Sequence, residues 1–188
     1  YVVIVTPENL FQQESIMIGI ILAAKIFVSV GLASDIVILK NNTYYTTGSF
    51  EVETTPAVVW SVLTDYDNIS KFVPLIKSSK VTKRDSKEVL VEQVLVGKLL
   101  IFTRQISLTL SIKETKPRKI VFKDISKVSL KNYFVSWTIV PTPKGTKVTY
   151  EITTTTKASV PKFIAKDVAK KLSDKLLKSI QEEIKRRS

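Results

Sequence analysis

The side chains with potential for chemistry are few in this chain of 188 residues, because it contains no histidine and no cysteine. Imidazole and thiol catalysis, zinc and iron–sulfur ligation, and disulfides are therefore excluded. Carboxylate, hydroxyl, amine and guanidinium chemistry remains, together with simple binding. The candidate polar side chains on the inner face of the predicted sheet are Gln93, Arg104, Asp124, Tyr133, Tyr150 and the indole N–H of Trp137.

Acid–base catalysis in such a chain requires a carboxyl group or a phenol whose pKa is shifted by burial. Asp124, Glu92 and Tyr150 are the candidates, but the strand alternation points Glu92 outward. We interpret Gln93 and Asp124 as rim or surface residues. Tyr150 and Trp137 are residues of a kind that more often serves as ordinary core aromatics than as ligand contacts.

Alternating strand patterns must position these residues. Residues 44–53 predict an opening strand, and Thr55-Pro56 starts a short helix that is followed by a second one ending near Phe72. Between 76 and 157, six strand patterns follow one another with turn signals between them. From Pro161 to about Arg186, apolar residues that include Leu172 recur every fourth position and predict one long helix. The order is that of a single α+β domain with a seven-stranded antiparallel sheet.

Turn positions predict how the strands pair. If Gly97-Lys98 is a two-residue turn, Val91 lies opposite Arg104 and Gln93 lies opposite Phe102. Arg104 then lies within an apolar stripe, where it either anchors a ligand, extends to water, or pairs with a structural carboxylate.

A second predicted turn, at residues 142–145, sets Trp137 opposite Tyr150. The hairpin before it places Phe122 beside Val135 and Asp124 beside Tyr133.

The charge is strongly positive, with 29 basic and 17 acidic residues and a net charge of +12. Such a chain is attracted to anionic surfaces, although a lysine-rich solvated surface explains the same excess. Nucleic acid is not expected as a partner, because exposed aromatics do not alternate with basic residues in any predicted strand. No cofactor is expected either.

The N-terminal region shows a different pattern. The single methionine, Met17, opens an apolar run, and we interpret residues 1–16 as leader sequence ahead of a start at Met17. Residues 17–34 resemble a signal peptide with small residues before Ser34, or alternatively a membrane anchor or a helix packed on the domain. We expect an exported protein, periplasmic or membrane-anchored, with cytoplasmic residence as the alternative, and a folded domain from 40 to 188.

Several short motifs resemble the START-like helix-grip superfamily, and within it the polyketide cyclase/dehydrase and coenzyme Q-binding family. The resemblance rests on Pro56 to Trp60, Asp65-Tyr66, Phe72-Val-Pro74, Trp137 to Pro141 and the terminal helix. It implies a curved sheet that grips the helix, with a cavity between them for a lipid, isoprenoid quinone or similar apolar ligand. The residues we expect at that ligand are Arg104, Tyr150, Trp137, Phe102, Gln93, Phe122, Tyr133 and Leu172.

Three functions compete under this resemblance. We favour a non-enzymatic carrier of a hydrophobic small molecule that docks on anionic membrane through the lysine-rich face of the terminal helix. The alternatives are a cyclase or dehydratase that uses a carboxylate or tyrosine, and a protein-interaction domain. Large side chains such as Phe102, Phe122, Trp137 and Phe163 are also able to fill the cavity, and the oligomeric state is left open.

Overall fold

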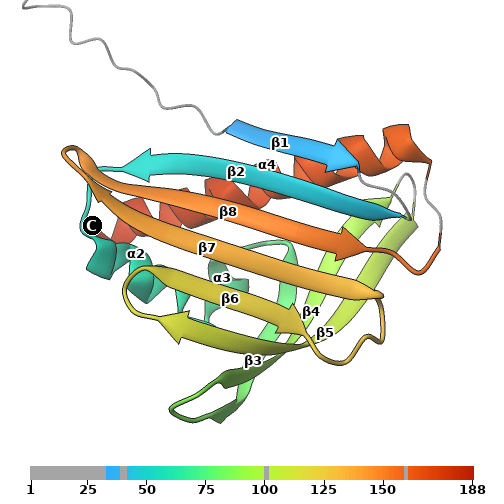
Figure 1. The fold of residues 1–188 in the computed structure, drawn as a ribbon, viewed down its shortest axis with the longest axis horizontal. Helices are drawn as coiled ribbons and strands as arrows, with labels where there is room; N and C mark the ends of the chain where they lie inside the picture. The colour runs from blue at the N-terminus through green and yellow to red at the C-terminus, as the bar shows by residue number, and fades with distance from the viewer. Residues whose placement is uncertain (1–32, 39–41, 100–101, 159–160) are drawn as a thin grey trace, which may run out of the picture. The chain divides into compact units, whose positions relative to one another are not determined.

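The computed structural model describes residues 33–38, 42–99, 102–158 and 161–188 (Figure 1). For residues 33–38, 98, 99, 102–104 and 162 it describes the backbone only. The expectations for residues 1–32 therefore lie outside the described residues. So do the expectations for the side chains of Phe102 and Arg104.

Three helices lie in the described chain. Helix α2 spans Pro56–Leu63, α3 spans Ile69–Phe72 and α4 spans Lys162–Arg187. Pro56 is suited to the start of α2, because proline has the φ of a helix and the first turn does not need its N–H group. All three helices match the sequence prediction.

Eight strands form one antiparallel sheet in the order β1-β2-β8-β7-β6-β5-β4-β3. The seven strands predicted from the sequence are all present, and with the closing helix they confirm the helix-grip α+β fold. Their bounds are β2 Thr43–Val52, β3 Ile76–Arg84, β4 Val89–Leu99, β5 Phe102–Thr115, β6 Lys119–Asp124, β7 Asn132–Thr142 and β8 Gly145–Thr155.

The eighth strand, β1 (Ala33–Ile38), was not predicted. It pairs antiparallel with β2, with Ala33 opposite Ser49 and Ile38 opposite Tyr44. The sequence analysis took this stretch as the end of an N-terminal segment. Its pairing extends the edge of the sheet that α4 also contacts.

The predicted pairing of β7 with β8 is confirmed. Trp137 lies opposite Tyr150, and Thr142 pairs with Gly145 across the Pro143-Lys144 turn. The pairing of Phe122 with Val135 is also confirmed.

The predicted pairing of β4 with β5 is wrong. Strand β4 continues through Gly97 to Leu99, so Val91 lies opposite Leu110 instead of Arg104, and Gln93 lies opposite Leu108 instead of Phe102. Gly97 is not a turn residue here: it pairs with Arg104 inside the ladder. Val91 faces a residue six positions beyond the predicted one, and an even shift leaves every side chain on the face that was predicted for it.

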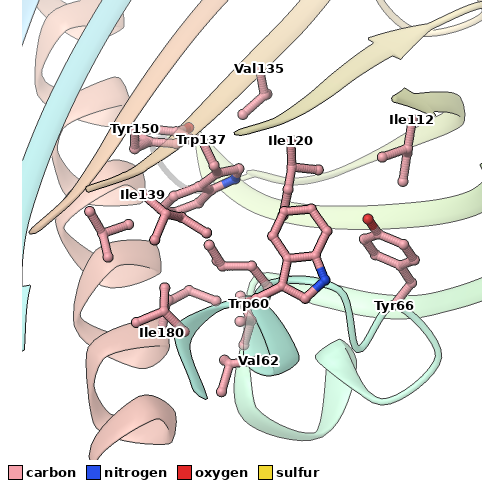
Figure 2. Close-up of a cluster of buried hydrophobic side chains, with 14 of the residues drawn as sticks. Trp60, Val62, Tyr66, Ile112, Ile120, Val135, Trp137, Ile139, Tyr150 and Ile180 are labelled. Carbon is pink, nitrogen blue, oxygen red and sulfur yellow. The ribbon is translucent and has the colours of Figure 1, made fainter. Parts of the chain in front are cut away.

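The core lies between the inner face of the sheet and the helices. Figure 2 shows Trp60 and Val62 of α2 meeting Trp137, Ile139 and Ile120 of the sheet, with Ile180 of α4 beside them. In the second half of α4, Leu177, Ile180 and Ile184 are fully buried. This half of the helix closes the core.

Candidate functional site

A hollow of about 700 Å³ lies beneath the first half of α4. Its walls come from α4, from the turn after α3, and from the end of β4. The lining residues are Pro74, Leu75, Val96, Phe163, Ile164, Asp167, Val168, Lys171, Leu172 and Lys175. Most of these side chains are apolar, so the hollow suits the body of an apolar molecule.

The hollow exists because the two halves of α4 pack differently. Ile164, Val168 and Leu172 continue the apolar stripe of the helix, yet they are only half-buried. Phe163 is 77% exposed. A half-buried apolar stripe of this kind has surface free to cover a ligand.

Gly97 faces Leu172, one of the residues that line the hollow. A Cβ atom at this position would lie 3.8 Å from Cδ1 of Leu172. Any longer side chain there would extend into the space beneath the helix. The backbone of Arg104 occupies the strand position directly opposite Gly97.

The outer rim of the hollow is charged. Nζ of Lys171 lies 2.8 Å from Oδ2 of Asp167, and both side chains are exposed. Lys175 lies one turn further along the helix. The rim is therefore polar while the interior is apolar.

Trp137 and Tyr150 form part of the packed core. Their ring centroids are 4.7 Å apart with an interplanar angle of 44°, and both rings are buried (Figure 2). Burial raises the pKa of Tyr150, nearby Tyr133 adds to this, and a hydrogen bond with Ser173 of α4 acts in the opposite direction. Tyr150 of β8 therefore contacts α4 at Ser173, the residue after Leu172.

Asp124 is buried, which corrects its interpretation as a rim or surface residue. It is 2% exposed and accepts hydrogen bonds from the backbone N–H groups of Thr109, Ser126 and Lys127 at 3.0–3.1 Å and from the Ser126 hydroxyl at 2.7 Å. These donors occupy the carboxylate and fix the loop after β6. Burial and the charge of Asp124 raise the pKa of half-buried Tyr133.

Gln93 is also buried, which corrects its interpretation as a rim or surface residue. Its register places it on the inner face of the sheet, opposite Leu108. Its Nε2 donates a hydrogen bond of 3.3 Å to Oγ of Ser79. Phe122 packs edge-to-face on Tyr66 with ring centroids 6.0 Å apart. Both side chains therefore belong to the inner packing of the sheet.

Among the described side chains, Leu172 is the one predicted ligand residue that lines the hollow. Gln93, Phe122, Tyr133, Trp137 and Tyr150 lie deeper between sheet and helix. Sequence reasoning did not assign the remaining apolar lining residues, of which Pro74 belongs to the Phe-Val-Pro motif and Ile164 and Val168 to the same stripe as Leu172. The weaker packing of the first half of α4 has no signature in that stripe.

A cluster of charged residues holds the far end of α4 and, through it, one wall of the hollow. Arg187 donates 2.7–2.8 Å hydrogen bonds to Glu183 and to Asp65, which precedes α3. Its guanidinium also lies over the ring of Phe72, 5.5 Å from the centroid. Pro74 and Leu75 lie two and three residues after Phe72, so this clamp positions the turn that lines the hollow.

The described residues contain no group of three or more acidic side chains arranged to hold a metal ion. Within the same ranges, no helix combines the length and hydropathy needed to cross a bilayer.

Comparison with solved structures shows the same architecture in proteins of very different sequence. A STAR-related lipid transfer protein from Xanthomonas axonopodis is 16% identical, with a TM-score of 0.62, over 82% of this chain and 98% of that chain. The Zhui aromatase/cyclase from Streptomyces sp. R1128 is 13% identical, with a TM-score of 0.65, over 77% and 95%. A START superfamily protein from Mycobacterium smegmatis is 14% identical, with a TM-score of 0.64, over 77% and 99%.

At these identities the likeness shows the fold. No curated protein sequence matches the chain. The sequence profile of the family described as polyketide cyclase/dehydrase and lipid transport matches residues 52–181, which include both short helices, the sheet from β3 to β8 and most of α4. The chain therefore belongs to the polyketide cyclase/dehydrase and lipid transport family.

Proposed function

We propose that this protein binds and carries a hydrophobic small molecule, such as a lipid or an isoprenoid quinone, without chemically changing it. The observation that carries the proposal is the hollow of about 700 Å³ between the first half of α4 and the end of β4. Its apolar walls remove the ligand's hydrocarbon surface from water, which contributes about 25 cal/mol for each Å² buried. The name of the lipid transfer protein from Xanthomonas axonopodis supports the same class of ligand.

Arg104 is our choice for the residue that holds a polar head on this ligand. Its strand position lies opposite Gly97, the residue beneath Leu172. Tyr150 is the second choice, because its hydroxyl already bonds Ser173. A guanidinium donates paired hydrogen bonds to phosphate, carboxylate or carbonyl oxygens.

We further propose that the protein is exported, in a periplasmic or membrane-anchored form, and that exposed lysines of α4 attract anionic lipid. Cell fractionation with an antibody against the folded domain tests the location. Recovery in the cytoplasmic fraction would contradict it.

The carrier function is tested by producing the full chain, recording a native mass spectrum and extracting the same sample with organic solvent. We expect a bound molecule of lipid mass that reappears in the extract. Gly97→Leu places a long side chain against Leu172 at the hollow and should abolish the adduct, whereas Val140→Leu, at an exposed position of β7 outside the hollow, should keep it. An adduct that survives Gly97→Leu with the fold intact would refute this site.

A cyclase or dehydratase is the second candidate, favoured by the placement of Tyr133 beside Asp124 under the sheet. Burial keeps the Tyr133 phenol protonated, which suits a hydrogen-bond donor to a substrate carbonyl. The test is turnover of a polyketide substrate by wild type and by Tyr133→Phe and Tyr150→Phe. Equal turnover in all three would retire this candidate.

A further inference from the structure

The loop between β6 and β7 and the first residues of β7 present apolar side chains to solvent. Ile125, Val128 and Phe134 are 49%, 64% and 38% exposed. We call these three residues, with Lys123, Lys127, Lys131 and Lys157 around them, the tip surface. The apolar side chains of a water-facing loop usually turn inward, so their exposure here calls for a partner.

This exposure does not come from a loose loop, because the loop is held at several points. Asp124 accepts the hydrogen bonds of Ser126 and Lys127 described above. Oγ of Ser129 accepts a 3.0 Å hydrogen bond from the backbone N–H of Ser107, and Leu130 is buried in the core. With its backbone fixed in this way, the loop holds Ile125 and Val128 outward in advance of binding, which lowers the entropic cost of docking.

The tip surface is positively charged. Lys123, Lys127, Lys131 and Lys157 are exposed, and Nζ of Lys157 donates a 2.6 Å hydrogen bond to the Val128 carbonyl. From Lys123 to Phe134 the sequence has one acidic residue, the buried Asp124. None of these four lysines forms an ion pair with another described residue.

Three lysines of α4 differ in this respect, because Lys170, Lys171 and Lys178 form ion pairs within the helix. Lys171 pairs with Asp167 at 2.8 Å and Lys178 with Glu182 at 3.9 Å. Each such pair reduces the positive charge of the helix face toward a membrane. The tip surface, in contrast, presents the full charge of its four lysines to anionic lipid.

The tip surface lies at the same end of the sheet as the hollow. Ser129 of the loop bonds Ser107 of β5, and Gln105, two residues before Ser107, pairs with Val96 in the wall of the hollow. Figure 1 shows the β6–β7 loop, the end of β8 and the start of α4 at one end of the sheet. A bilayer that touches the loop thus faces the end where the hollow lies.

We propose that the tip surface docks on an anionic lipid bilayer, with Ile125, Val128 and Phe134 entering the headgroup region and the four lysines contacting acidic lipid. The purpose that we assign to this docking, exchange of ligand with the bilayer, rests on the proposed carrier function. Apolar side chains inside a basic rim match the chemistry of a bilayer interface. An apolar protein partner would not need the lysines.

The test uses the absence of cysteine, because one introduced cysteine can be labelled alone. Val128→Cys carries a polarity-sensitive fluorophore on the tip surface. Val140→Cys is the matched control, since Val140 is 47% exposed on the same strand as Phe134, near the opposite turn. The full chain is mixed with vesicles of phosphatidylcholine and phosphatidylglycerol that contain brominated lipid, a short-range quencher.

We expect quenching and a blue shift at position 128 and neither at position 140. The signal should weaken in high salt and in pure phosphatidylcholine, since it depends on charge. Replacing Lys123, Lys127 and Lys131 by glutamine should raise the half-saturating vesicle concentration about fivefold for each lysine. The probe reports its own surroundings, so membrane contact elsewhere in the chain does not produce the signal.

Equal quenching at both positions, or a probe at 128 that stays in water at saturating vesicles, would overturn the proposal. In the second case a protein partner takes the place of the bilayer. The native mass spectrum of the wild-type chain is read separately. A lipid adduct without tip contact refutes the docking surface alone, and tip contact without an adduct refutes the carrier function alone.

Discussion

Arg187 donates a hydrogen bond of 2.8 Å to Asp65, which lies 122 positions earlier in the chain. The contact joins the last turn of α4 to the loop between the two short helices. Burial acts to raise the pKa of Asp65, but the hydrogen bonds from Asn68 and Arg187 outweigh it and lower that pKa. In this chain the pair gives Asp65 of the Asp65-Tyr66 motif a structural role, which is to hold the last turn of α4.

The first prediction concerns this pair. Arg187→Leu should lower the free energy of unfolding by about 1.5 to 3 kcal/mol, because it removes charged hydrogen bonds to two partly buried carboxylates. Urea unfolding followed by tryptophan fluorescence measures it. The control is Lys171→Gln, which breaks an exposed pair and should cost less than about 0.5 kcal/mol. Equal losses in both variants would mean that the clamp has no special role.

The second prediction is a loss of stability in acid that depends on Glu183. Hydrogen bonds from Arg186 lower its pKa from 4.5 to about 2, despite burial. Since the pKa is lower in the folded state, this stabilisation is complete above the unfolded value and is lost as the pH falls from 4.5 toward 2. Glu183→Gln should be less stable than wild type near neutral pH, with the difference narrowing in that window. A difference in stability between Glu183→Gln and wild type that does not change with pH would contradict this prediction.

The third prediction compares two glycines. Gly145 has φ of 141°, and a Cβ atom there would lie 2.2 Å from the Val52 carbonyl oxygen. Gly145→Ala should therefore cost about 1 to 3 kcal/mol from backbone strain, and more from the clash. Gly97→Ala meets only Leu172 at 3.8 Å and should be neutral or stabilising by up to about 1 kcal/mol. Thermal unfolding of both variants, each compared with wild type, tests this prediction.

The fourth prediction concerns the loop after β6. Asp124→Ala leaves the N–H groups of Thr109, Ser126 and Lys127 without their acceptor, and should cost about 3 kcal/mol. Amide hydrogen exchange at Ser126 and Lys127 should become faster in the same variant. Asp167→Ala, at an exposed ion pair, is the control. Unchanged exchange at both amides would show that the carboxylate does not hold the loop.

The fold was predictable because local signals agreed with its strand order. Pro143-Lys144-Gly145 marked a true turn, and the pairing of Trp137 with Tyr150 followed from it. Gly97-Lys98 carried the same signal but lies inside a strand, where Gly97 pairs with Arg104. Strand β4 ends at Leu99 and β5 begins at Phe102, and Leu100 and Ile101 between them are not turn-forming residue types.

The site was less predictable than the fold for a physical reason. Strand alternation reports which side chains face inward, and it placed Tyr150 and Gln93 correctly on the inner face. It does not report whether the space in front of them is filled. Here Trp137 and Tyr150 fill it, and the open volume lies where α4 leaves the sheet near Leu172.

The two halves of α4 are held unequally, so that the helix is fixed at one end only. Its C-terminal half is fixed by Leu177, Ile180 and Ile184 and by the ionic cluster around Glu183, while its first half stands over open volume. A small rotation of α4 about its fixed C-terminal half moves the residues near Phe163 by the largest distance. The opening of the hollow beside Phe163 can therefore widen when this one helix bends. No hydrogen bond of the sheet has to break for that movement.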